Sequence, residues 1–402
     1  MKTTYLLLCL LGIGSVSGAG QTKQPQKIGD FIESTSYNEH RRNATRSLQY
    51  TPDGDDFVCI NGKNRFTRAL YGSHTAFRLE TSDRPVFAAY TKENPKHICF
   101  KLQTSGGTVA LDSTEHCESR YTAGRRSYSL SDPAFGGGSL SITTWALPDK
   151  EGAIWQFNAR NFKEFHPVLL ASISEIRNSK LNRNGDMGAD PADSFEAPLQ
   201  PQQLQSFPVQ IDGTLYILLE NQELRTLTTA EGENLFKKAE AARSETASRI
   251  RIETPDPYFN TLGGTLAMAA DGIWDGEVWL HGAIGWRMPL SGWRAAYTGD
   301  VLGWHDRART HFNAYAASQV TEVPNTLPHP AQDSALHLAR SVKKWGTPQY
   351  SNGYICRNPH RNNQMHHYDM NLCYIDELLW HFKWTGDLDY VRQMWPVITR
   401  HL

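Results

Sequence analysis

The chain has 402 residues, with 41 basic and 42 acidic side chains, so its formal net charge is −1. Proteins that bind nucleic acid or anionic membranes carry a basic patch, and this balanced sequence argues against both partners. The length predicts two or three domains.

Residues 1–19 have the composition of a cleaved secretory signal peptide. Lys2 supplies a positive charge, an apolar run covers 6–16, and small residues at 17–19 suit cleavage by a signal peptidase. The apolar run is shorter than the roughly 20 residues that a membrane-spanning helix needs. We therefore expect an exported protein, periplasmic or secreted, with no membrane anchor after cleavage.

Five cysteines follow the signal peptide, an odd number without the paired spacing of zinc sites. A disulfide scaffold is not expected in a chain this large, although one bridge among the first three is possible in an oxidising compartment. No metal and no cofactor are expected. The five are Cys59, Cys99, Cys117, Cys356 and Cys373.

A polar entry segment, residues 20–50, precedes a stretch with the pattern of short strands, residues 51–231. Runs of apolar and β-branched residues recur about every ten positions and are separated by turn residues, which predicts an antiparallel β-sandwich. Asn61-Gly62 is the strongest hairpin signal in this part. The strands are expected at 57–60, 86–90, 97–102, 140–145 and 153–157.

The sequence becomes helical after residue 231. A charged, alanine-rich segment, 232–253, predicts a linker helix, and residues 254–402 predict several helices with apolar stripes. Asp256 and Pro257 suit the cap and first position of a helix that buries Phe259, Leu262 and Leu266. The last predicted helix reaches residue 402 without a stop signal, so we expect this domain to be incomplete.

The segment 274–294 has the composition of a sugar-binding site. It alternates tryptophans with Gly, Arg, Asp and Glu and lacks a clean period. Aromatic rings stack on the apolar faces of pyranosides, while charged and imidazole groups bond to their hydroxyls; core packing is the alternative, because Trp is highly buried on average. The side chains expected around the sugar are Trp274, Trp279, His281, Trp286, Arg287, Trp293, Arg294, Asp300, His366 and Asp369.

Two carboxyl groups in this segment are candidates for catalysis. Glycoside hydrolysis normally needs one protonated and one ionised carboxyl, and an aromatic-lined pocket favours the protonated form. Glu277, beside Val278 and Trp279, is the better acid candidate, and Asp275 is the second. The alternative for either residue is an ion pair with a nearby arginine or the capping of a turn.

Three polar positions farther along have structural alternatives. Asp300 precedes the second predicted helix and suits a helix cap as well as a substrate contact. His366 and Asp369 stand at the end of a long aromatic-containing segment, 321–368, which predicts a structured loop that forms part of a site. Adjacent histidines point in different directions, so His366 and His367 do not predict a metal site.

Several motifs in residues 232–402 resemble those of the six-hairpin glycosidases, which have an (α/α)6 barrel. They are Thr254-Pro255-Asp256-Pro257-Tyr258, Gly292-Trp293-Arg294, Thr298-Gly299-Asp300 and Trp384-Thr385-Gly386-Asp387. The stretches 65–72 and 185–191 are similar to a branch of that superfamily found in polysaccharide-degrading gut bacteria. The resemblance implies a β-sandwich followed by the first hairpins of an (α/α)6 toroid, and commonly an inverting mechanism.

The predicted function is therefore glycoside hydrolysis, with a plant or host polysaccharide or oligosaccharide as substrate. A non-catalytic glycan-binding protein is the first alternative. A polysaccharide lyase, which acts on uronates through a Tyr or His base, is the second. The sugar, the linkage and the oligomeric state do not follow from the sequence.

Overall fold

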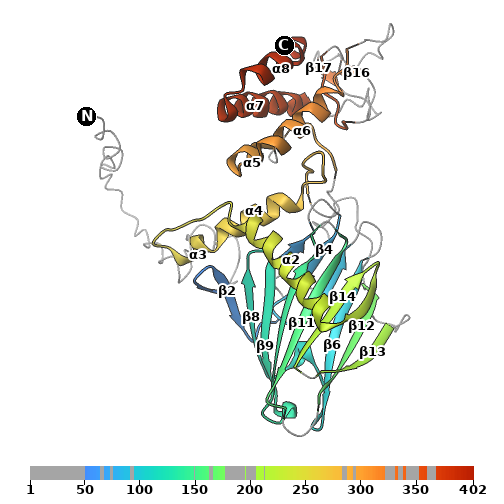
Figure 1. Ribbon diagram of the computed structural model, residues 1–402. Helices are drawn as coiled ribbons and strands as arrows, with labels where there is room; N and C mark the ends of the chain where they lie inside the picture. Colours follow the sequence, from blue (N-terminus) through green and yellow to red (C-terminus); the bar gives the residue numbers. More distant parts are fainter. Residues whose placement is uncertain are drawn as a thin grey trace, which may run out of the picture. The chain divides into compact units, whose positions relative to one another are not determined.

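The computed structural model places an antiparallel β part before a helical part, as the sequence predicts (Figure 1). Residues 49–402 form one compact unit. The predicted signal peptide and almost all of the entry segment lie outside the described residues. The described residues are 50–63, 68–72, 76–90, 95–148, 150–162, 166–176, 195, 205–211, 213–282, 288–292, 296–321, 331–333, 338–340, 353–359 and 368–402.

Two antiparallel sheets make up the β part. The first has eight strands in the order β1-β2-β8-β9-β10-β11-β14-β15, and the second has seven, in the order β13-β12-β6-β5-β4-β3 with β7 beside β6. The first sheet consists of β1 (Thr51–Asp53), β2 (Asp56–Ile60), β8 (His116–Thr122), β9 (Arg125–Ser131), β10 (Ser139–Ala146), β11 (Gly152–Arg160), β14 (Thr214–Glu220) and β15 (Glu223–Leu227). The second consists of β3 (Arg68–Tyr71), β4 (Arg78–Thr81), β5 (Val86–Tyr90), β6 (Lys96–Thr104), β7 (Gly107–Ala110), β12 (Val168–Glu175) and β13 (Gln205–Gln210).

The two sheets pack face to face through aromatic side chains. Phe87 on β5 meets Trp155 on β11 edge to face at 5.4 Å, and Phe100 on β6 meets Phe157 on β11 at 5.0 Å. All four side chains belong to one buried apolar cluster that draws on both sheets. The alternating pattern of the sequence therefore produces a sandwich, because each strand points every second side chain into this shared core.

The hairpin predicted at Asn61-Gly62 is wrong. Strand β2 pairs with β1 and β8, whereas β3 pairs with β4 in the other sheet, so the chain passes from one sheet to the other here. Asn61 adopts a left-handed φ of 50° and accepts a bond from the Cys117 N–H at 2.9 Å. A two-residue hairpin turn with left-handed residues does occur at Asn221-Gln222, between β14 and β15.

Helix α2 (Thr229–Ala247) covers part of the first sheet (Figure 1). It begins at a capping box of Thr228 and Glu231, a signal that the predicted start at residue 232 missed. Its Phe236 ring lies 4.0 Å from Trp145 on β10, and Glu240 accepts a 2.7 Å bond from the Trp145 indole N–H. The predicted linker helix is thus packed against the sandwich along its length.

Helices α3 (Pro257–Asn260) and α4 (Leu262–Gly272) follow, with Asp256 as the cap and Pro257 at the first position, as predicted. The predicted buried stripe is wrong, because Phe259, Leu262 and Leu266 are exposed. The buried face of α4 instead consists mainly of glycine and alanine, with Met268 and Asp271 beside them. A Cβ at Gly263 would lie 2.8 Å from the Ile250 carbonyl oxygen, so glycine permits the close approach.

The remaining helices are α5 (Ala296–Val301), α6 (His305–Ala316), α7 (Tyr368–Thr385) and α8 (Leu388–His401). The second predicted helix is divided in two at Gly303, which has a left-handed φ of 73°. Gly386 and Asp387 connect α7 to α8: the glycine takes a left-handed φ of 63°, and Asp387 caps the first turn of α8. Strands β16 (Ala331–Asp333) and β17 (Leu338–Arg340) pair with each other.

The five cysteines after the signal peptide are all free, so the bridge left open among the first three is not formed. Burial raises the pKa of Cys117 to about 12. Within the described part of the chain, none of the helices has the length and apolar character required to span a membrane.

Candidate functional site

Three acidic side chains from two parts of the helical region act on one buried tyrosine, Tyr315 of α6. We call Asp275, Glu277 and Glu377 the carboxyl cluster. Burial raises the pKa of Tyr315 well above its usual value, and the charges of all three carboxyl groups raise it further. The elements that carry these groups pack on α6 around the phenol: the His311 ring lies 5.8 Å from Trp279 of the turn and 4.8 Å from Tyr315, and the Tyr315 ring lies 6.4 Å from Tyr374 of α7.

A tight turn carries two members of the cluster. Trp274 and Trp279 pair as an antiparallel bridge, and the Asp275 N–H donates to the Val278 carbonyl at 3.2 Å. The Asp275 carboxylate accepts from the N–H groups of Glu277 and Val278, at 3.0 and 2.8 Å. Asp275 therefore caps the turn, the role left open for it, and Glu277 stands half-buried on the same turn.

Trp274 and Trp279 lie in the core rather than on a surface. They are 3% and 1% exposed, and their rings lie 4.7 Å apart. Arg307 packs over Trp274 and forms a 2.7 Å ion pair with Asp271, which is also buried. Core packing, the alternative for these tryptophans, is thus the role that the structure gives them. Their rings hold the turn against α6, and they present no open face to a sugar.

His311 on α6 fixes the turn from the other side. Its Nδ1 accepts a bond from the Trp279 N–H at 3.2 Å, so this nitrogen carries no proton. Burial lowers the pKa of His311 to about 3. The imidazole is therefore neutral at physiological pH and serves as an acceptor for the backbone beside Glu277.

Glu377 is the member of the cluster that the sequence did not single out. It lies on the buried face of α7 and is 2% exposed. The same face carries Asn371 and His381, both buried, so three polar groups stand on a face where apolar residues are the rule. Buried polar groups of this kind are expensive unless they are bonded or used, which makes this face a candidate functional surface.

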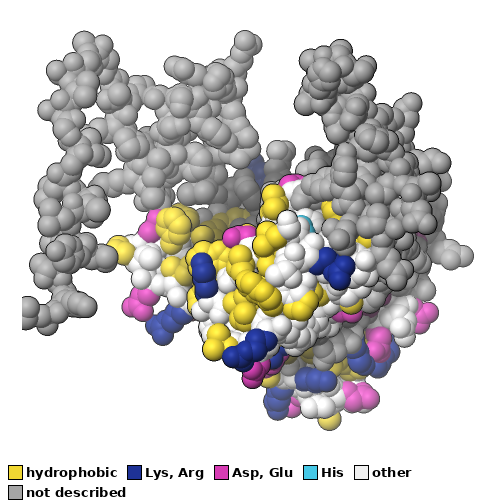
Figure 2. Space-filling view, turned by 90° about the horizontal axis from the view of Figure 1, so that it is seen from above, with side chains coloured by type: hydrophobic (Ala, Val, Ile, Leu, Met, Phe, Trp, Pro, Cys, Tyr) yellow, Lys and Arg dark blue, Asp and Glu magenta, His cyan; other side chains and the backbone are white. Residues whose placement is uncertain are grey.

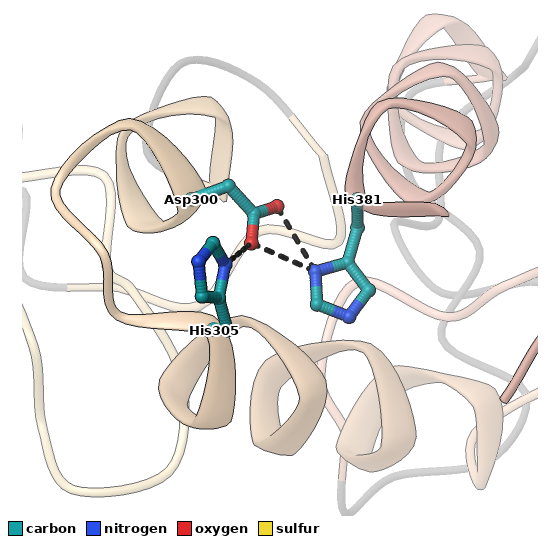
Figure 3. Close-up of side chains that lie close together, drawn as sticks. All are labelled: Asp300, His305 and His381. Atoms are coloured by element: carbon teal, nitrogen blue, oxygen red, sulfur yellow. Dashed lines mark hydrogen bonds and ion pairs between the residues drawn. The ribbon is translucent and has the colours of Figure 1, made fainter. Parts of the chain in front are cut away.

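A second polar cluster lies one turn along α7 (Figure 3). Asp300 of α5 is 5% exposed, and its carboxylate accepts from His305 Nδ1 at 2.7 Å and from His381 Nδ1 at 2.9 Å. His381 is fully buried against the rings of Phe312 and Tyr390. Asp300 therefore joins α5, α6 and α7, and the helix cap left open for it is not its role.

Asp300, His305 and His381 are also the described side chains that could hold a metal ion, with ligand atoms within 4.8 Å of one another. The N–O distances of 2.7–3.0 Å are those of hydrogen bonds. Two ligands on one zinc ion, each about 2.0–2.1 Å from the metal in tetrahedral geometry, stand farther apart than this. The arrangement thus fits two Nδ1–H donors on one carboxylate, which positions α7 and with it Glu377.

Arg357 stands at the end of a short segment that is tied to α6 and α7. The Asn371 side chain accepts from the Ile355 N–H at 2.7 Å and donates to the Ile355 carbonyl at 3.1 Å. The Cys356 N–H donates to Ser318 Oγ at 3.2 Å. These bonds hold Arg357 close enough to Tyr315 for its charge to lower the pKa of that phenol.

The other predicted site residues are dispersed. His281 is half-buried, and its backbone N–H donates to the Met288 carbonyl at 3.0 Å. Asp369 is exposed in the first turn of α7. Gly292 lies against α7, because a Cβ there would be 2.5 Å from the Met370 carbonyl oxygen. Trp286, Arg287, Trp293, Arg294 and His366 lie outside the described residues.

Comparison with known families gives one match, over residues 95–249, to the family described as Domain of unknown function (DUF4450). The matched span begins beside β6 and ends just after α2, so it unites most of the sandwich with the helix that packs on it. It stops before Asp275, and every residue of the carboxyl cluster lies beyond it. No curated protein matches the sequence.

Proposed function

We propose that the chain belongs to a glycoside hydrolase and that Glu277 and Glu377 are its pair of catalytic carboxyl groups. The observation that carries the proposal is that the turn with Glu277 and the face of α7 with Glu377 both pack on the part of α6 that holds Tyr315. Trp279 of the turn lies against His311, and the Tyr315 ring lies 4.8 Å from His311 and 6.4 Å from Tyr374 of α7. Glycosidases need two carboxyl groups on different sides of the scissile bond, and here they come from separate elements. The proposed substrate is a plant or host polysaccharide or oligosaccharide.

The two carboxyl groups have different surroundings, which supports different roles. Glu377 is almost fully buried on α7, and burial favours the protonated form that an acid catalyst needs. Glu277 is half-buried on a turn, where water can reach its carboxyl group, and we assign it the role of positioning the attacking water. The sequence favoured Glu277 as the acid; the burial of Glu377 leads us to assign that role to Glu377. Hydrolysis with inversion at the anomeric carbon is the expected outcome.

A six-hairpin toroid remains our proposal for the complete fold of the helical part. Helices α7 and α8 form a hairpin, and α7 presents the apolar side chains Leu372, Leu379 and Trp380 to the outside. Hydrophobic side chains gather on the described surface seen in Figure 2. Exposed apolar groups on a helix that is also buried on its other face are what a neighbouring hairpin covers in such a toroid.

The raised pKa of Tyr315 argues against this phenol as the base of a lyase reaction. A lyase base takes a proton from carbon and needs a pKa near the working pH. The pKa of Tyr315 is raised, by burial first and by the carboxyl cluster next. Exported location and the gut-bacterial family resemblance, both expected from the sequence, are part of the same proposal.

The test is sugar release by the full-length protein from a panel of plant and host glycans, measured as new reducing ends. We expect release by the wild type and a loss on the order of 100-fold or more in the Glu377→Gln variant, as for other positioned acid catalysts. Asp376→Asn, one residue away on the exposed face of α7, is the matched control and should retain turnover. Glycan binding without release by the wild type would instead identify a non-catalytic glycan-binding protein.

A further inference from the structure

Arg357 is a half-buried cation that has no acidic partner in the described part of the chain. Its Nη2 lies against the Met288 sulfur, and among the described residues no carboxylate or carbonyl oxygen bonds to it. Burial lowers the pKa of Arg357, and Tyr315 is the described group that acts against that decrease. A guanidinium in such surroundings normally gains a bidentate oxygen partner.

Other arginines of the chain show what that partner usually is. Arg307 and Arg309 form 2.7 Å ion pairs with Asp271 and Asp387. Arg126, which is fully buried in the sandwich, donates to the Ser82 carbonyl at 3.0 Å and to the Tyr50 hydroxyl at 2.7 Å. Among these described arginines, Arg357 alone lacks an oxygen partner, and a bound ligand could supply one.

The segment that carries Arg357 is built to hold it still. Asn371 clamps both polar backbone groups of Ile355, and Ser318 bonds to the next N–H. A side chain on a rigidly held backbone loses less entropy when it binds, which is the usual property of a recognition group.

The sequence around Arg357 is also basic, with five Lys or Arg and no Asp or Glu from residue 334 to 368.

Arg357 and the turn with Glu277 meet through one backbone pairing: Arg357 Nη2 lies against the Met288 sulfur, and the Met288 carbonyl accepts from the backbone N–H of His281, four residues after Glu277. The charges of Arg357 and of the carboxyl cluster also act on the same phenol, Tyr315. A group bound at Arg357 therefore lies beside the proposed catalytic pair. We propose that Arg357 forms a subsite for an anionic substituent of the sugar, either the carboxylate of a uronic acid or a sulfate ester. The inference rests on the proposed function, since it names the class of sugar that the same site takes.

The test measures binding by titration calorimetry, with three oligosaccharides of equal length as probes: a galacturonate oligomer, a sulfated chondroitin oligomer and a neutral xylo-oligomer. We expect the wild type to prefer one of the two anionic probes, and that probe identifies the source of the anion. Arg357→Met keeps much of the side-chain volume and should weaken this binding about 10- to 100-fold, the usual effect of losing a charged hydrogen-bond partner. Arg357→Lys keeps the positive charge but not the forked guanidinium group, and its affinity should lie between those of the wild type and Arg357→Met.

Arg392→Met is the control for the loss of one positive charge, because Arg392 is 71% exposed on α8 and pairs with Asp389. It should bind like the wild type. Circular dichroism and the melting temperature establish that each variant is folded, and the lysine variant replaces the methionine variant if the latter is not.

Failure of this inference and failure of the proposed function give different results. Preference for the neutral probe, equal binding by Arg357→Met, or no binding to either anionic probe would overturn the anionic subsite, whether or not sugar is released in the glycan panel. Arginine-dependent binding of an anionic probe without any hydrolysis would support the subsite and count against the hydrolase.

Discussion

His311 couples the stability of the site to pH. Its pKa in the folded protein is about 3, because burial disfavours the charged imidazole, whereas an unfolded histidine titrates near 6.5. Between these values the unfolded chain binds a proton that the folded protein does not. Stability is therefore fully present above about pH 6.5 and is lost as the pH falls towards 3.

We expect the urea midpoint of the wild type to fall between pH 7 and pH 4, with this one group contributing a slope of up to about 1.4 kcal/mol per pH unit. His311→Gln keeps an acceptor for the Trp279 N–H and should flatten that slope. Leu266→Ala, an exposed change that alters no titratable group, is the control and should leave the slope unchanged. An equal slope in the His311 variant would show that this histidine does not titrate as its burial implies.

Asp300 is the residue on which the placement of α7 depends. Asp300→Asn removes the charge that accepts both imidazole N–H groups, and we expect a loss of about 2 kcal/mol in the free energy of unfolding, typical of bonds to charged groups. Asp306→Asn, an exposed acid one turn away on α6, should change it by less than about 0.5 kcal/mol. Equal effects of the two changes on the free energy of unfolding would contradict the role of Asp300 in joining α5, α6 and α7.

At the scale of elements, α4 is the helix whose exposed and buried faces the sequence misassigned. The leucines Leu262 and Leu266 lie outside, whereas glycine and alanine dominate the buried face, because the helix backbone approaches Ile250 and α2 closely. A pattern based on hydrophobicity assigns the largest apolar residues to the buried face, so it does not predict a buried face that is formed by closely packed small residues.

This packing reverses the usual effect of a Gly→Ala change in a helix. Gly263→Ala should destabilise the protein by about 1–3 kcal/mol, because the new Cβ would lie 2.8 Å from the Ile250 carbonyl oxygen. In an open helix the same change stabilises by up to about 1 kcal/mol. Leu266→Ala, on the exposed face, should be nearly neutral, and thermal melting of both variants decides the matter.

Helix α7 explains why the sequence did not single out Glu377, one member of the proposed catalytic pair. The helical spacing of Leu372, Ile375, Leu379 and Phe382 predicts that these four form the buried stripe. Ile375 is buried, but Leu372 and Leu379 are exposed, and the buried face also carries Tyr374, Glu377 and Leu378. A helix that is apolar on two faces gives no single stripe, so its rotation cannot be read from periodicity. The signal in the sequence for Glu377 as a buried polar residue was its position directly before two leucines, Leu378 and Leu379.

For the molecule as a whole, the order of strands and helices follows from the sequence, whereas the site depends on long-range contacts. Turn residues and alternation predicted the positions of β5, β6, β10 and β11 closely, since strand patterns are local. Glu277 and Glu377 stand 100 positions apart, and only the packing of α6 between them brings both to Tyr315. No local pattern carries that information.

The most direct test of the catalytic pair is a double-mutant cycle in kcat with Glu277→Gln, Glu377→Gln and the variant that combines them, on the best substrate from the glycan panel. Residues that act as a unit are not additive, so each single change should lower kcat by about 100- to 10,000-fold and the double variant by little more than the worse single one. Turnover near the wild-type value in either single variant, with folding intact, would contradict the account.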